Sequence, residues 1–211
     1  MIIISHRGYW HNQEEKNTET AFIRSFDMGF GTETDIRDCN GKLVISHDIP
    51  NGTEISLDYF LSLLKGRDLP LALNIKADGL SDLLVSSLSK ANVTNAFVFD
   101  MSIPDQMSYV RENKINVFAR VSEYEKTPAF YHESFGIWLD GFHSIWYDKS
   151  LVEGYISEGK YICIVSPELH KRSDYKDLWK MLKISGLSVS TQLMLCTDLP
   201  EDARDFFKED I

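Results

Sequence analysis

The sequence predicts an α/β fold: a closed (β/α)8 TIM barrel that forms a single domain over residues 1–211. Short apolar runs typical of strands alternate with helical patterns along almost the whole chain. The alternation recurs eight times, which favours parallel strands joined by helical crossovers. A chain of 211 residues has room for one such barrel, and no linker or repeat divides it. The alternative is an open doubly wound sheet, but no glycine-rich phosphate turn follows the first strand.

The elements are expected in alternating order. The expected strands are 2–5, 31–37, 71–76, 96–100, 115–120, 136–140, 160–165 and 192–196. The expected helices are 18–28, 56–65, 80–91, 103–113, 148–158, 174–184 and 200–207, with a weaker pattern at 127–133. Ser56 and Ser81 lie where helix N-caps belong. Asn40-Gly41 predicts a tight hairpin that returns His47 over the barrel mouth.

Charge and composition restrict the class of partner. The chain is 43% hydrophobic and 26% charged, as expected of a globular protein, and its formal net charge is -10. This balance argues against a nucleic-acid partner and against adhesion to an anionic membrane. An anionic substrate would therefore need a local cluster of positive charge or a metal ion.

Cysteine usage and hydropathy indicate the compartment. Cys39, Cys163 and Cys196 are widely spaced and predict neither a disulfide framework nor a zinc site. Cys163 and Cys196 lie in strand-like runs, so we expect buried thiols there. The first four residues are too short for a signal sequence, and no run has the length of a membrane span. We expect a reduced, cytoplasmic compartment and no stable membrane insertion.

Two histidines and two acids are the most informative residues. His6 directly follows the apolar run 2–4, and His47 follows 43–45. Glu33 and Asp35 are two residues apart in the second strand, so their side chains share one face. Two carboxylates on one face can hold a hard divalent cation, and two imidazoles can exchange protons near neutral pH. The combination suits cleavage of a phosphate ester.

Other polar residues follow the strands, and in a barrel these strand ends form the active-site mouth. Arg7 next to His6 could bind phosphate oxygens in a planar fork, and Gly8 would let the backbone approach a ligand. Asp198 precedes Leu199-Pro200 and is expected to cap the last helix. The remaining strand-end candidates for the substrate pocket are Asp100 and Glu168.

These residues resemble the glycerophosphodiester phosphodiesterase family, within the barrel phosphodiesterases that include phospholipase C-like enzymes. The matching segments are His6-Arg7-Gly8, Asn17-Thr18 with Ala21-Phe22, Gly31 through Glu33-x-Asp35-x-Arg37, Val44 through His47-Asp48, Asn74-Ile75-Lys76 and Thr197-Asp198-x-Pro200. Their order and spacing agree over the first 80 residues, whereas 100–190 supports the barrel only through its rhythm.

The resemblance implies a metal-dependent phosphodiesterase acting on a small diester of glycerol, polyol or sugar type. One divalent cation, Mg²⁺ or Ca²⁺, would be the cofactor. By position, the catalytic residues would be His6 and His47. The resemblance does not divide the roles between them, and our hypothesis is that His6 acts as base and His47 as acid. The metal ligands would be Glu33 and Asp35, and the phosphate would contact Arg7 and Lys76.

Three departures from the family pattern concern the mouth. Asn74 stands where the family has its third metal carboxylate, and an amide oxygen can ligate Mg²⁺ or Ca²⁺ but brings no charge. Lys16 stands where the family has a glutamate, which makes it a further pocket candidate. The site would hold its metal more weakly or serve a more anionic substrate. Only 49–55 separate His47-Asp48 from the next helix, so the alcohol pocket is undefined.

Other functions stay open at this point. Asn74 and Lys16 are also compatible with a non-catalytic barrel that binds phosphate esters after its metal site eroded. An unrelated barrel enzyme, such as an isomerase of phosphorylated sugars, would need a base beside a carbonyl-polarising group. The sequence does not choose between direct hydrolysis and formation of a cyclic phosphate.

Overall fold

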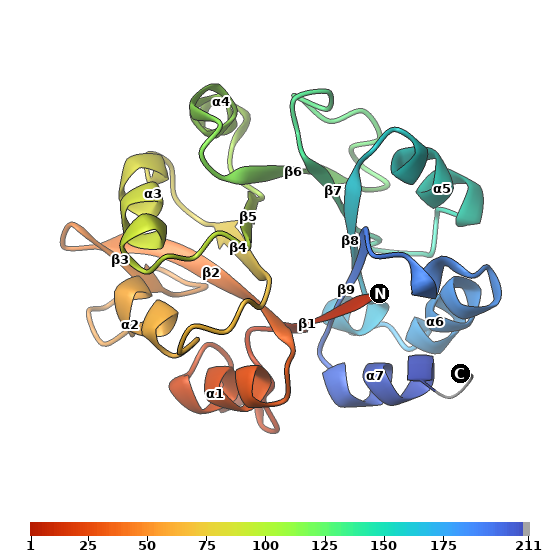
Figure 1. Cartoon of the computed structure of the whole chain (residues 1–211), viewed down its shortest axis with the longest axis horizontal. Helices are drawn as coiled ribbons and strands as arrows, with labels where there is room; N and C mark the ends of the chain where they lie inside the picture. The colour runs from red at the N-terminus through yellow and green to blue at the C-terminus, as the bar shows by residue number, and fades with distance from the viewer. Residues whose placement is uncertain (209–211) are drawn as a thin grey trace.

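The computed structural model describes residues 1–208, and within them eight parallel strands close into a barrel (Figure 1). The parallel strands are β1 (Ile2–His6), β2 (Gly31–Cys39), β4 (Leu71–Ile75), β5 (Ala96–Phe99), β6 (Asn116–Val121), β7 (Gly136–Leu139), β8 (Tyr161–Val165) and β9 (Leu193–Thr197). Strand β1 pairs with β9 on one side and β2 on the other, which closes the ring. The predicted fold class is confirmed.

Helices cover the outside of this ring (Figure 1). They are α1 (Glu19–Asp27), α2 (Leu57–Ser62), α3 (Ser81–Lys90), α4 (Ile103–Glu112), α5 (Lys149–Ser157), α6 (Tyr175–Ile184) and α7 (Pro200–Lys208). Three short 3₁₀ turns complete the set: η1 (Gln13–Glu15), η2 (Pro167–His170) and η3 (Leu187–Val189). Each of the seven main predicted helices is present. None of the helices in residues 1–208 has the length and apolar character needed to cross a bilayer.

Two local predictions are wrong. Residues 127–133 form turns instead of a helix. The backbone of Phe130 has a φ of 54°, a left-handed conformation that a helix interior does not admit. Ser81 does not cap its helix, because it is the first helical residue and its hydroxyl bonds Glu112. Ser56 does act as predicted, since its side chain accepts a hydrogen bond from the amide of Tyr59.

The predicted hairpin is present. Strand β3 (Lys42–Ile45) runs antiparallel to β2, with Cys39 opposite Lys42 and Ile36 opposite Ile45. Asn40 and Gly41 both have positive φ, 52° and 76°, as a tight two-residue turn requires. The hairpin extends β2 beyond the barrel and returns the chain to the mouth just before His47.

Stacked side chains fill the barrel interior under strands β5 to β7. Phe97 lies against Phe118 with ring centroids 3.9 Å apart, and Phe99 against Trp138 at 3.8 Å. Cys163 and Cys196 are buried in the same cluster, as predicted. Bulky apolar groups therefore fill this side of the barrel interior, and the buried acids Glu33 and Asp35 lie on β2.

Gly136 offers a test of the packing between β7 and β8. A Cβ atom at this position would lie 2.6 Å from the carbonyl oxygen of Tyr161, where the backbone cannot yield cheaply. We expect Gly136→Ala to lower the free energy of unfolding by about 1–3 kcal/mol, measured by urea denaturation. Gly154→Ala, in the open middle of α5, should instead be stabilising by up to about 1 kcal/mol. Equal stability of the two variants would contradict this packing.

Candidate active site

Barrel closure places β1 between the two strands that carry its polar partners. In the register of the sheet, His6 lies opposite Glu33 of β2, and Ser5 lies opposite Thr197 of β9. The residue after Thr197 is Asp198, so the end of β1 is flanked by a carboxylate on each side. The site is therefore built from strand ends that are distant in sequence.

His6 is held between these two carboxylates. Its Nδ1 lies 2.7 Å from Oδ1 of Asp198, and its Nε2 lies 3.8 Å from Oε2 of Glu33. Because an ionised carboxylate only accepts hydrogen bonds, Asp198 assigns the ring proton to Nδ1 and leaves Nε2 toward Glu33. Burial lowers the pKa of His6 below 6.5, and the hydrogen bond that His6 donates to Asp198 opposes that shift.

Asp198 does not cap α7, contrary to our expectation, because its carboxylate is turned to His6. The start of the helix is instead stabilised by Thr197, whose hydroxyl accepts from the amide of Leu199. Glu168 supports this segment: its carboxylate accepts from the amide of Asp198 at 3.2 Å and from the hydroxyls of Thr197 and Ser166. Both oxygens of Glu168 are thus engaged by the protein rather than by an open pocket.

Glu33 and Asp35 point into the barrel and are buried, with exposed fractions of 2% and 0%. Burial, reinforced by the neighbouring Asp35, raises the pKa of Glu33 from 4.5 to about 8. Ile36 faces the opposite way, into the core against the helices. The predicted alternation along β2 is therefore present.

Asp35 collects positive and hydrogen-bonding partners from three segments. Arg7 Nε lies 3.0 Å from its Oδ2, and Lys76 Nζ lies 3.5 Å from its Oδ1. Asn17 donates from Nδ2 to Oδ2 at 2.9 Å, while its Oδ1 accepts from Thr34. The sequence motif contained Asn17, but residue types alone did not reveal that it ties the loop after β1 to Asp35.

Asn74 lies beside Asp35 in the register of β2 and β4. Its amide nitrogen donates to Oδ2 of Asp100 at 3.3 Å, and Asp100 also pairs with Arg120 at 3.1 Å. Burial raises the pKa of Asp100. Asp100 therefore fixes the side-chain amide of Asn74, and together with Arg120 it lines a separate cavity of about 400 Å³.

Three buried oxygens in this cluster lack a hydrogen-bond donor within residues 1–208: Oε2 of Glu33, Oδ1 of Asp35 and Oδ1 of Asn74. Unsatisfied acceptors of this kind are costly in the absence of a cation or another donor. Two carboxylates and one amide are oxygen donors that suit Mg²⁺ or Ca²⁺. Over the same residues, however, no three or more His, Cys, Asp or Glu side chains gather as a metal-binding group.

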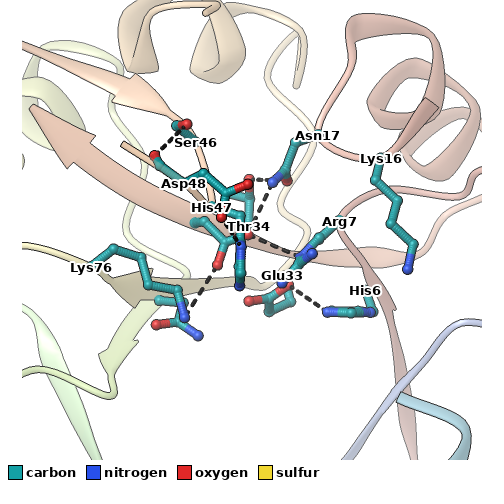
Figure 2. A network of polar contacts seen from close by, with 12 residues as sticks. His6, Arg7, Lys16, Asn17, Glu33, Thr34, Ser46, His47, Asp48 and Lys76 are labelled. Atoms are coloured by element: carbon teal, nitrogen blue, oxygen red, sulfur yellow. Dashed lines mark hydrogen bonds and ion pairs between the residues drawn. The ribbon is translucent and has the colours of Figure 1, made fainter. Parts of the chain in front are cut away.

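His47 lies after β3, at the outer edge of the cluster. The amide of Ser46 donates to the carbonyl of Asp35, and Arg37 donates to the carbonyl of His47, which ties this turn to β2. The Nδ1 of His47 lies 2.9 Å from Oδ1 of Asp48, and 47% of the His47 side chain is exposed. In Figure 2 the His47 ring projects toward Glu33, which lies between it and His6 in that view.

Gly8 has a structural role that the sequence did not indicate. Its φ is +82°, and a Cβ would lie 2.8 Å from the side chain of Ala21. The absence of a side chain therefore allows helix α1 to pack against this backbone, and the approach of a ligand to it stays a prediction. Arg7 itself has a φ of 58°, a conformation that aims its side chain at Asp35.

Structural comparison relates this arrangement to known proteins. No protein-family model and no curated protein matches the chain by sequence. The structure is similar to an Agrobacterium tumefaciens protein named as a glycerophosphoryl diester phosphodiesterase, with a TM-score of 0.74 and 13% identity over 99% of this chain and 98% of that one. An Oleispira antarctica phosphodiesterase, in complex with the product sn-glycerol-3-phosphate, gives 0.70 and 14% over 99% and 97%.

A tryptophan synthase complex from Pyrococcus furiosus gives a TM-score of only 0.51 at 13% identity, over 99% of this chain and 94% of that one. By this measure the fold is more similar to the two phosphodiesterases than to the tryptophan synthase complex. The fold implied by the sequence motifs is confirmed, and the likeness itself concerns the fold.

The raised pKa of Glu33 predicts a pH-dependent stability in the presence of chelator. A carboxyl group that binds its proton more tightly in the folded state stabilises fully below pH 4.5, and this stabilisation is lost as the pH rises to about 8. Relative to Glu33→Gln, the wild type should lose up to about 1.4 kcal/mol per pH unit across this window. Urea denaturation at several pH values measures the difference. A difference between the wild type and Glu33→Gln that does not change with pH would contradict the shift.

Proposed function

We propose that this protein is a metal-dependent phosphodiesterase that cleaves a small diester of glycerol, polyol or sugar type by acid–base catalysis with His6 and His47. One observation carries the proposal: two histidines on separate strand ends flank the buried carboxylates Glu33 and Asp35, and one buried oxygen of each carboxylate accepts no hydrogen bond from residues 1–208. The sequence motifs and the shared fold of the phosphodiesterases support it. The roles assigned to individual residues are part of this proposal.

Glu33, Asp35 and Asn74 would hold one Mg²⁺ or Ca²⁺, since their unsatisfied oxygens suit a hard cation. Bound there, the cation would supply Lewis-acid stabilisation of the charge that develops on the phosphate oxygens. Arg7 and Lys76 already lie at Asp35, and their side chains would contact the same phosphate oxygens.

His6 is suited to act as the base. Its lowered pKa leaves the ring neutral near pH 7, and Asp198 keeps the free lone pair on Nε2, which is directed into the site. Asp198 would also stabilise the imidazolium formed when Nε2 takes a proton from the nucleophile. That nucleophile is a water molecule or a hydroxyl of the substrate itself.

His47 is suited to act as the acid. It is half exposed at the outer edge of the site, so a leaving alcohol could depart toward solvent after its alkoxide is protonated. Because the Oleispira antarctica phosphodiesterase is described with sn-glycerol-3-phosphate, diesters of this phosphate are the first substrates to assay. The cytoplasmic location and the lack of a nucleic-acid partner stay predictions from the sequence.

Removing either histidine tests the assignment. We expect His6→Ala and His47→Ala each to lower kcat by about 10²–10⁴-fold, because each deletes one proton transfer. Turnover of sn-glycero-3-phospho-alcohols with Mg²⁺ or Ca²⁺ is the measurement. His132→Ala, at an exposed position outside this cluster, should retain wild-type turnover. Near-normal turnover of both single variants at His6 and His47 would reject the mechanism.

A calorimetric titration distinguishes the enzyme from a non-catalytic phosphate-ester-binding barrel, which Asn74 and the small number of clustered acids favour. We expect saturable heat with Mg²⁺ or Ca²⁺, lost in Asp35→Asn and tighter in Asn74→Asp, because charge on the donors sets affinity for hard cations. Binding of a phosphate ester with no metal heat, and no turnover, would instead indicate the binding module.

A further inference from the structure

Lys16 presents a cation at the rim of the proposed active site that the mechanism above does not use. Its ammonium lies 4.3 Å from the centre of the Trp10 ring, and the side chain is 21% exposed. The carboxylate within ion-pair range is Asp198, at 4.0 Å. No hydrogen-bond acceptor reaches this ammonium from residues 1–208, although it has three protons to donate.

The backbone around Lys16 is fixed rather than loose. The adjacent Asn17 donates its amide to the carbonyl of Arg7 at 3.0 Å and bonds Asp35 through its side chain. Trp10 in turn donates from its ring to the carbonyl of His6. The ring on which Lys16 rests is therefore anchored to a proposed catalytic residue. In Figure 2 the tip of Lys16 ends near His6, on the side of the ring away from Glu33 in that view.

A cavity of about 380 Å³ lies beside the proposed acid. Arg7, Lys16 and His47 all line it, between the loop after β1 and the turn after β3. Its acidic lining residues are Glu19, Asp48 and Glu54. Glu19 accepts a hydrogen bond from the Tyr59 hydroxyl, Glu54 accepts from the amides of residues 51 and 52, and Asp48 is 92% exposed. An alcohol protonated by His47 would thus leave into a space that Lys16 borders.

The charges at the site exceed what one phosphodiester needs. The cationic side chains are Arg7, Lys16 and Lys76, and the carboxylates are Glu33, Asp35 and Asp198. A divalent cation on Glu33 and Asp35 would leave the cluster more positive than a single monoanionic phosphate can neutralise. This count concerns these six side chains; the cavity beside them is also lined by the acids Glu19, Asp48 and Glu54.

From these observations, and resting on the proposed function, we propose that Lys16 binds a second anionic group on the leaving alcohol of the substrate. The preferred diesters would carry a carboxylate or a phosphomonoester near the scissile phosphate. Lys16 would donate a charge-assisted hydrogen bond to that group, and the cavity beside His47 would hold the carbon skeleton between them.

Three diesters of sn-glycerol 3-phosphate test this assignment, because they differ only in the leaving alcohol: glycerol, glycerate or glycerol phosphate. The measured quantity is the ratio of kcat/KM for each anionic diester to kcat/KM for the neutral one. We expect a ratio above one in the wild type, lowered about 10–100-fold in Lys16→Gln, as for loss of one charge-assisted hydrogen bond. A loss of rate that affects all three diesters equally in one variant cancels in this ratio. Comparing the glycerate and glycerol phosphate arms identifies the anion.

Two further variants separate charge from packing. Lys16→Arg keeps the cation and should keep most of the preference. Lys126→Gln removes a lysine that likewise lies over a tryptophan, Trp146 at 5.6 Å, and should leave the ratio unchanged. A ratio that is the same in the wild type and Lys16→Gln would overturn the inference while leaving the proposed function intact.

If none of the three diesters is cleaved with either metal, the proposed function fails. The role of Lys16 is then tested by ligand binding instead of turnover. Non-hydrolysable phosphonate analogues of the same compounds can be titrated by calorimetry. Tighter binding of the anionic analogues to the wild type than to Lys16→Gln would support the anion site. Equal affinities in the two proteins would overturn it.

Discussion

The pairing of β1 with both β2 and β9 is the constraint on which the site depends. It brings the first strand of the chain against the last, so that His6 lies between Glu33 and Asp198. In an open sheet β1 would have only one of these neighbours, and the imidazole would lose either its orienting carboxylate or its acidic neighbour. Closure also buries Glu33, and burial is the main cause of its raised pKa.

The parts of the structure that follow from local periodicity could be predicted from the sequence. Apolar runs set the eight strands, and Asn40-Gly41 set the hairpin because both residues accept positive φ. The shared face of Glu33 and Asp35 follows from the two-residue period of a strand. The segment 127–133 was misjudged because the left-handed Phe130 gives no signal in an otherwise helical pattern.

Contacts between distant segments were harder to predict. Asp198 looked like a helix cap, because the residues beside it in sequence are a leucine and a proline. Its real partner is 192 residues away. Pairing the first predicted strand with the last in a closed barrel would have placed residue 197 beside residue 5, and therefore Asp198 beside His6. The packing role of Gly8 is of the same kind: the close neighbour of its backbone is Ala21 on α1, which only the packed structure identifies.

The two histidines acquire different properties from their surroundings rather than from their sequence motifs. Strands enclose His6, so desolvation disfavours its charged form and Asp198 orients it. The short turn before α2 covers His47 poorly and leaves 47% of its side chain in contact with water. Groups of the same type placed in unlike environments can divide the work of acid and base. The same uncovered edge opens the cavity beside Lys16, so the short turn sets both the exposure of the proposed acid and the space for the leaving alcohol.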